Sequence, residues 1–132
     1  MSKRERIYTQ EETAKMQEME NFLLSYQYCI DALGLLQYDK ERKRSKRWAE
    51  HHKPDGDLLT GNEDVLRARM YEVRELVSSM KNGREKLILY YHYLRGESIE
   101  RAADLIGFSR RTGYRIHKKA LLTAACLALR RQ

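Results

Sequence analysis

Five basic residues and no acidic residue lie in the segment IGFSRRTGYRIHKKAL, residues 106–121. At 100° per residue in a helix, Arg111, Arg115 and Lys118 share one side of this segment. Arginine can bind O6 and N7 of guanine with two parallel hydrogen bonds, whereas lysine more often contacts phosphate. The spacing therefore predicts a helix that reads base pairs in the major groove of double-stranded DNA. The residues expected to contact DNA are Ser109, Arg110, Arg111, Thr112, Tyr114, Arg115, Lys118 and Lys119.

A second, shorter helix is expected directly before this one. Ser98 can cap a helix over residues 99–106, and Ser109 can cap the helix that follows. Gly107 permits a positive φ angle at the turn, and the small alanines at residues 102–103 allow another helix to approach closely. A short helix, a turn that contains glycine and a capped second helix are typical of a helix-turn-helix.

Gly113 stands in the interior of the second helix, on the side opposite the arginines. Glycine in a helix interior costs roughly 1 kcal/mol relative to alanine. Two explanations fit the sequence. Either the two helices approach one another very closely at this position, or Tyr114 or Phe108 fills the space that a larger residue would occupy.

The net charge of +7 is concentrated in two places. Residues 81–132 hold twelve Lys and Arg against four Asp and Glu, and the run KERKRSKR over residues 40–47 holds six against one. Clustered positive charge is typical of a surface that binds a polyanion. Contact with the DNA backbone and a merely solvated helix end fit the second run equally well. The basic residues of this run are Lys40, Arg42, Lys43, Arg44, Lys46 and Arg47.

The first half of the chain is expected to form two long helices. Thr9 and Glu12 have the spacing of a capping box, so a helix should begin near Thr9 and continue into the basic run. Proline and glycine predict a loop near residues 49–62, and Thr60 and Glu63 repeat the capping spacing. The apolar residues spaced by three and four are Met16, Met19, Leu23, Tyr26, Ile30 and Leu33, then Leu66, Met70, Val73, Val77 and Met80.

These patterns predict an all-α fold. Two striped helices joined by a loop indicate an N-terminal antiparallel helical hairpin over residues 1–80, followed by the helix-turn-helix module over residues 81–132. Asn82 and Gly83 are expected to end the second helix of the hairpin, with Gly83 in a left-handed conformation. A third helix is expected in REKLILYYHYLRG, and its inner face should consist of Leu87, Tyr91 and Leu94.

The C-terminal sequence ALLTAACLALRRQ continues the last helix without a breaker, and its apolar residues point in all directions. A helix that is apolar on every side should be buried on every side. The hairpin of the same chain is one cover for it. A second copy of the chain is the favoured cover, because two-fold pairing also supplies two DNA half-sites. A homodimer is therefore expected, with an interface that includes Leu122, Ala125 and Leu129.

Other features argue against a membrane protein or an enzyme. No apolar run approaches the roughly 20 residues that span a bilayer, and the N-terminus lacks the apolar centre of a signal peptide, so a cytoplasmic location is expected. Cys29 and Cys126 are expected to be buried, reduced thiols. No catalysis, cofactor or metal is expected, because the one cluster of metal-ligand residue types lacks the spacing of a zinc signature: His51, His52, Asp55 and Asp57.

With these motifs in place, residues 84–122 resemble the fourth region of bacterial sigma factors, which reads the −35 promoter element. The shared features are a tyrosine-containing helix, Gly-Phe-Ser-Arg at the turn and Ile-x-Lys-Lys-Ala-Leu in the second helix. A helical hairpin before such a module is similar to phage-encoded late transcription regulators of the ArpU and RinA type. The resemblance implies binding to promoter DNA and contact with the RNA polymerase of a bacterial host. Gly113 departs from the bulky aliphatic residue that is usual at its position.

Two readings of the role remain. The chain has too few residues for a separate promoter-melting domain, so we expect a regulator that assists or recruits a polymerase without opening DNA. The alternative is a small terminase subunit, which also combines a helix-turn-helix with helical assembly elements. Such a protein would bind packaging-site DNA instead of a promoter.

Overall fold

The computed structural model describes residues 6–42 and 63–131, and the side chains of its first helix are described as far as Tyr38. These two ranges contain helices and no β-strand, so the prediction of an all-α fold is confirmed for them. The elements in chain order are α1 (Gln10–Arg42), α3 (Glu63–Ser78), α4 (Gly83–Leu89), the π-helical turn η1 (Tyr90–Leu94), α5 (Ile99–Ile106) and α6 (Arg110–Arg130).

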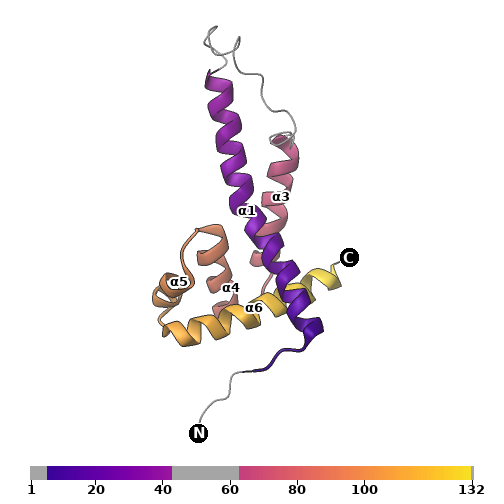
Figure 1. Ribbon diagram of the computed structural model, residues 1–132, viewed down its shortest axis with the longest axis vertical. Helices are drawn as coiled ribbons and strands as arrows, with labels where there is room; N and C mark the ends of the chain where they lie inside the picture. Colours follow the sequence, from indigo (N-terminus) through magenta and orange to yellow (C-terminus); the bar gives the residue numbers. More distant parts are fainter. Residues whose placement is uncertain (1–5, 43–62, 132) are drawn as a thin grey trace.

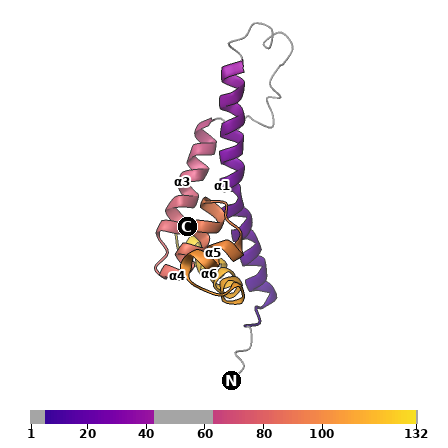
Figure 2. The same ribbon diagram turned by 90° about the vertical axis from the view of Figure 1, so that its left-hand side faces the viewer.

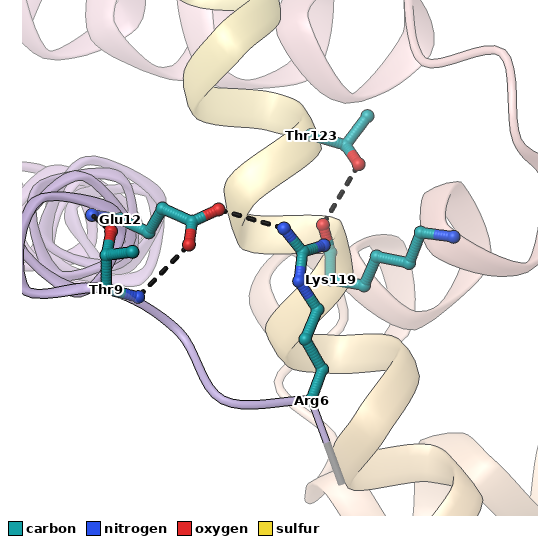
Figure 3. Close-up of polar contacts among 5 residues, drawn as sticks. All are labelled: Arg6, Thr9, Glu12, Lys119 and Thr123. Carbon is teal, nitrogen blue, oxygen red and sulfur yellow. Dashed lines mark hydrogen bonds and ion pairs between the residues drawn. The ribbon is translucent and has the colours of Figure 1, made fainter. Parts of the chain in front are cut away.

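The long helix α1 begins with the predicted capping box. The backbone N–H of Thr9 donates to Oε1 of Glu12, and the backbone N–H of Glu12 donates to Oγ1 of Thr9, both at 3.0 Å (Figure 3). This backbone hydrogen bond from Thr9 is the main reason why the pKa of Glu12 lies below its ordinary value. Arg6 adds an ion pair to the same carboxylate at 2.9 Å. The helix then continues as far as Arg42, into the start of the basic run, as predicted.

Helix α1 packs against different neighbours along its length. Its first half lies across α6 and also packs against α3, whereas its second half extends beyond α6 with α3 alongside (Figures 1 and 2). The buried residues follow this change of partner: Met16, Met19, Leu23 and Tyr26 join the main core, and Cys29 and Ala32 meet Leu66 of α3. Ile30 belongs to the apolar spacing of the sequence but is 36% exposed, because Cys29 and Ala32 are the residues of this stretch that face α3.

The connection from α3 to α4 differs from the predicted one. Helix α3 ends at Ser78, and Asn82 caps the next helix by accepting hydrogen bonds from the backbone N–H groups of Arg84 and Glu85. Gly83 is the first residue of α4, and only Gly96 and Gly107 have a positive φ within the described ranges. Asparagine is a strong N-cap residue, and this role decides the conformation of the segment.

The inner face of the third helix was predicted correctly only in part: Tyr91 and Leu94 are half-buried against the core. Ile88, Leu89 and Tyr93 are fully buried, whereas Leu87, which was predicted to face inward, is 42% exposed. Helix α4 is a single short element that packs against both α5 and α6. A stretch this short contains too few turns for its apolar spacing to define one buried side.

One hydrophobic core joins both predicted segments of the chain. It contains side chains of α1 and α3 together with side chains of α4, η1, α5 and α6. Figure 1 shows α6 crossing the base of α1, with α4 and α5 beside that crossing. The second half of α6 contributes Ala120, Leu121, Ala124 and Ala125 to this core. The orientation of α6 is therefore fixed by the N-terminal helices as well as by its own neighbours in sequence.

Cys29 and Cys126 are both free thiols, but only Cys29 is buried as predicted; Cys126 is exposed. Burial raises the pKa of the Cys29 thiol. Four sets of predictions fall outside the described residues: the loop near residues 49–62, the capping role of Thr60, the basic residues 43–47 and the cluster at residues 51–57. Lys40 and Arg42 lie in the last turns of α1, where only the backbone is described.

Candidate nucleic-acid interface

The turn between α5 and α6 has the local structure that the sequence predicts. Ser98 accepts a hydrogen bond from the backbone N–H of Arg101 at the start of α5, and Ser109 accepts one from Thr112 at the start of α6. Gly107 has a φ angle of 82°, in the left-handed region where glycine is favoured. These three features reverse the chain sharply between the two helices.

The helices α5 and α6 make an unusually close contact at Gly113. A Cβ atom built on Gly113 would lie 2.5 Å from the Cβ of Ala103, which is closer than two carbon atoms can approach without movement. Ala102 and Ala103 are fully buried. Of the two explanations for this glycine, the structure shows the first: close approach of the helices. Tyr114 does not fill the space, because its side chain is 42% exposed.

The first half of α6 presents its basic side chains outward. Arg110, Arg111, Lys118 and Lys119 are exposed, and Arg115 is half-buried. No acidic residue occurs between Arg110 and Lys119, so this stretch has no internal charge compensation. Exposed cations on one half of a helix, next to a tight turn, form a surface that can meet a polyanion such as the DNA backbone.

The hydroxyl groups of Ser109 and Thr112 are engaged with each other at the start of α6. Ser109 accepts from the backbone N–H of Thr112 at 3.2 Å and donates to Oγ1 of Thr112 at 3.0 Å. Their structural role is to cap the helix. The hydroxyl proton of Thr112 is not used in these bonds and could be donated to a phosphate oxygen, and that contact with DNA stays a prediction.

Tyr114 makes a cross-helix contact that the sequence did not suggest. Its hydroxyl donates a hydrogen bond to Oε1 of Glu100 on α5. This bond is the main reason why the pKa of Glu100 lies below its ordinary value and that of Tyr114 above it. Arg110 also lowers the pKa of Glu100 through its positive charge. The interface therefore includes one carboxylate among the basic residues, held in place by the tyrosine.

A buried polar cluster lies directly behind the basic half of α6. The hydroxyl of Tyr93 lies 2.6 Å from Nε2 of His117 and donates at 2.9 Å to Oε2 of Glu20. Burial is the main cause that lowers the pKa of His117 to about 4, and the nearby His92 and Lys118 lower it further. Burial likewise raises the pKa of Tyr93, together with the hydrogen bond to Glu20. His117 is therefore neutral at pH 7.

Sequence reasoning missed Glu100, Tyr93, His117 and Glu20. The partners in these contacts are 14, 24 and 73 residues apart in sequence. No helical period or motif relates residues at such separations before the fold is known. A histidine between basic residues, as in IHKK, gives no signal that its ring will be buried.

The residues proposed for a dimer interface are mostly covered by the chain itself. Ala125 is only 6% exposed and belongs to the core, so its placement in an interface was wrong. Leu122 is half-buried against the same core. Helices α1 and α3 provide this cover, because both contact α6. Leu129, which is 53% exposed, is the one residue of the three that still faces outward.

Comparison with known proteins found no matching family model, no matching curated protein and no matching solved structure. Among the helices in the described part of the chain, none combines the length and the apolar composition needed to cross a membrane. Residues 6–42 and 63–131 also contain no cluster of three or more His, Cys, Asp or Glu side chains that could hold a metal ion.

Proposed function

We propose that this protein is a sequence-specific DNA-binding regulator of transcription. Helices α5 and α6 act as a helix-turn-helix, with α1 and α3 as an N-terminal hairpin that supports it. The observation that carries the proposal is the combination of a glycine turn at Gly107 with an α6 whose first half exposes four cations and no acid. In a helix-turn-helix, the N-terminal residues of the second helix contact base edges in the major groove.

The four exposed cations of α6, together with half-buried Arg115, divide into two roles. Arg111 and Arg115 lie one turn apart near the start of α6 and suit bidentate contacts with guanine. Lys118 and Lys119 lie farther along the helix and suit phosphate contacts, which add affinity without sequence preference. Lys40 and Arg42, with the basic residues that follow them, would extend these backbone contacts.

The biological role follows from the resemblance of residues 84–122 to the promoter-reading region of sigma factors. We propose a phage or prophage late-gene activator that binds double-stranded promoter DNA and acts with the RNA polymerase of its host, in the bacterial cytoplasm. A small terminase-like packaging protein is the alternative. The genomic position of the bound DNA distinguishes the two: promoters support the regulator, and a packaging site supports the terminase.

Selection from a pool of random-sequence duplexes tests the proposal directly. The wild-type protein should enrich one sequence, here called the selected duplex. Arg111→Ala should then weaken binding to the selected duplex by about 1–3 kcal/mol, with a smaller loss on random DNA. Lys118→Ala should weaken both equally and flatten the salt dependence. Arg74→Ala, which removes an exposed arginine from α3, is the matched control and should leave binding unchanged.

Two outcomes would contradict the proposal. If no sequence is enriched, the protein does not read DNA. If Arg111→Ala loses the same affinity on selected and random DNA, the first half of α6 contacts only the backbone.

A homodimer remains part of the proposal through exposed Leu129. Sedimentation of the wild type and of Leu129→Glu tests it, and a monomeric wild type at micromolar concentration would contradict it.

A further inference from the structure

Three helical elements meet at the hydroxyl group of Tyr93. This side chain, 1% exposed, comes from η1, while Glu20 comes from α1 and His117 from α6. A tyrosine hydroxyl has one proton, and a carboxylate can only accept, so the proton of Tyr93 goes to Glu20. The hydrogen bond at 2.6 Å to His117 must then be donated by the Nε2–H group of the imidazole. The three side chains form one chain of donors and acceptors across three helices.

The π-helical turn that carries Tyr93 is itself fastened to α1. Nε2 of Gln27 donates to the backbone carbonyl oxygens of Tyr93 at 3.0 Å and Leu94 at 3.1 Å. The wider winding of a π-helix leaves carbonyl groups that need partners from outside the turn, and such turns often occur at functional positions. Gln27 and Glu20, two turns apart on α1, therefore hold the backbone and the side chain of Tyr93.

His117 lies near the point on α6 where the exposed basic residues give way to the buried ones. It directly precedes the exposed Lys118 and Lys119, and the buried stretch begins three residues later at Ala120. Its own side chain is only 12% exposed. Apolar contacts hold α6 against its neighbours, but they are non-directional and do not by themselves select one exact rotation of the helix. Hydrogen bonds are directional and fail when their angle changes, so the contact with Tyr93 defines one rotation of α6.

We propose that Glu20, Tyr93 and His117 form a positioning lock that sets the rotation of α6 against α1, and with it the direction in which Arg111 and Arg115 point. The DNA part of this inference rests on the proposed function. The lock requires a proton on Nε2 of His117, because this N–H group donates to the hydroxyl of Tyr93. The groups that face this ring are Glu20 from α1, His92 and Tyr93 from η1, and Lys118 from α6 itself.

The rotation of α6 can be measured without DNA. Spin labels at positions 14 and 118, both exposed, report the distance between α1 and α6 in a background with Cys29→Ala and Cys126→Ser. The wild type should give one narrow distance distribution. Tyr93→Phe keeps the buried ring and removes the hydroxyl, so it should broaden or shift the distribution. Tyr26→Phe is the matched control, because Tyr26 is also buried and its hydroxyl bonds to no other described residue.

Binding to the selected duplex then connects the lock to base reading. Tyr93→Phe should lower the ratio of selected to random affinity by about tenfold, the effect of losing one bidentate base contact. His117→Gln places an amide donor near Nε2 and should preserve the ratio, whereas His117→Leu should lower it. If Tyr93→Phe fails to fold, the two variants at position 117 still provide the test, because they differ in whether the side chain can donate a hydrogen bond to Tyr93.

The outcomes separate the lock from the proposed function. An unchanged distance distribution in both Tyr93→Phe and His117→Leu overturns the lock, whatever the protein binds. A changed distribution with an unchanged affinity ratio overturns its role in positioning the arginines. If the wild type enriches no duplex, the proposed function fails, and the distance measurement still decides the lock. The proposal is supported if the ratio of selected to random affinity falls in His117→Leu but not in His117→Gln.

Discussion

The two halves of α6 are one unbroken helix with opposite surroundings. The first half, Arg110–Lys119, carries five cations and lies largely on the surface. The second half, from Ala120 onward, supplies four fully or nearly buried residues to the core shared with α1 and α3. The comparison shows how a small protein can orient a charged surface. The apolar half packs against α1 and α3, and because the helix is unbroken and rigid, the position of the charged half is fixed as well. The contacts at Gly113 and His117 both lie in the first half, before this transition.

The largest predicted effect is a difference in stability between variants of two adjacent residues, Lys119 and Ala120, at the boundary between the halves. Ala120 is fully buried, so Ala120→Asp places a carboxylate in the core without a partner. An uncompensated buried charge costs about 3–5 kcal/mol, a large part of the total stability of a small domain. We expect Ala120→Asp to be largely unfolded in urea titrations monitored by circular dichroism.

Lys119→Asp provides the comparison at the neighbouring, exposed position. Its free energy of unfolding should change by no more than about 0.5 kcal/mol, as is usual at the surface. Its DNA affinity should fall, because an acid replaces a base in the proposed interface. Equal destabilisation of the two variants would show that the two halves of α6 are not distinct in burial.

The next predicted effect is the pH dependence of stability that comes from the buried imidazole ring of His117. The pKa of His117 is about 4 in the folded state and 6.5 as an ordinary value. Between these values the unfolded chain binds more protons than the folded one, so stability falls as the pH is lowered from 6.5 toward 4. At 1.36 kcal/mol per pKa unit, the loss is about 3 kcal/mol once the pH is below 4.

His117→Gln isolates this contribution, because glutamine does not titrate. The free energy of unfolding should fall between pH 7 and pH 4 by about 3 kcal/mol more in the wild type than in His117→Gln. Direct titration of the ring by nuclear magnetic resonance gives the same pKa independently. A ring that titrates near 6.5 would mean that His117 is solvated and that the cluster behind α6 is open.

The third effect tests the close contact between α5 and α6. In Gly113→Ala, the new methyl group meets the side chain of Ala103, and overpacking costs about 1–3 kcal/mol. Alanine recovers roughly 1 kcal/mol through its better helix propensity, so the net loss should be about 0–2 kcal/mol. Gly34→Ala is the matched control: nothing lies within 4 Å of its Cβ position, so it should stabilise the protein by about 1 kcal/mol.

A second substitution sharpens this test. Ala103→Gly removes the obstructing methyl group, and the double variant Ala103→Gly with Gly113→Ala should recover part of the loss. The two positions should therefore show a favourable coupling in a double-mutant cycle. Additive losses would mean that the helices do not touch at this point.

These contacts also show what could be predicted from the sequence. The caps at Thr9, Ser98 and Ser109 and the turn at Gly107 were predicted correctly, because each depends on residues within four positions. The inward placement of Gly113 followed from the helical period alone. The phase of α4 and the exposure of Ile30 depend on which helix lies alongside, and no local pattern contains that information.

The candidate site divides in the same way. Four of the five basic residues of α6 are exposed, and the run of charge in the sequence indicated them; the half-burial of Arg115 was not indicated. The lock was not indicated either, because Glu20 and His117 meet at Tyr93 only after three helices have packed. Sequence therefore indicates what the surface could bind, whereas the structure indicates what holds that surface in place.

The smallest predicted effect concerns the exposed contact between Tyr114 and Glu100, beside the first half of α6. Tyr114→Phe removes the hydrogen bond and leaves the ring, and because this contact is exposed to solvent the stability should change only slightly. The pKa of Glu100 is lowered mainly by this bond, so it should rise in the variant, and carboxyl titration by nuclear magnetic resonance can measure the change.

The sign of the pH dependence follows from that lowered pKa. A carboxyl group with a depressed folded-state pKa stabilises the protein above its ordinary value of 4.5 and loses this contribution as the pH falls through the folded value. Wild type and Tyr114→Phe should therefore differ at neutral pH and converge in acid. If Tyr114 contacts DNA through its ring, the variant keeps wild-type affinity for the selected duplex. If the hydroxyl holds Glu100 away from the phosphates, affinity falls and the double variant Tyr114→Phe with Glu100→Gln restores it.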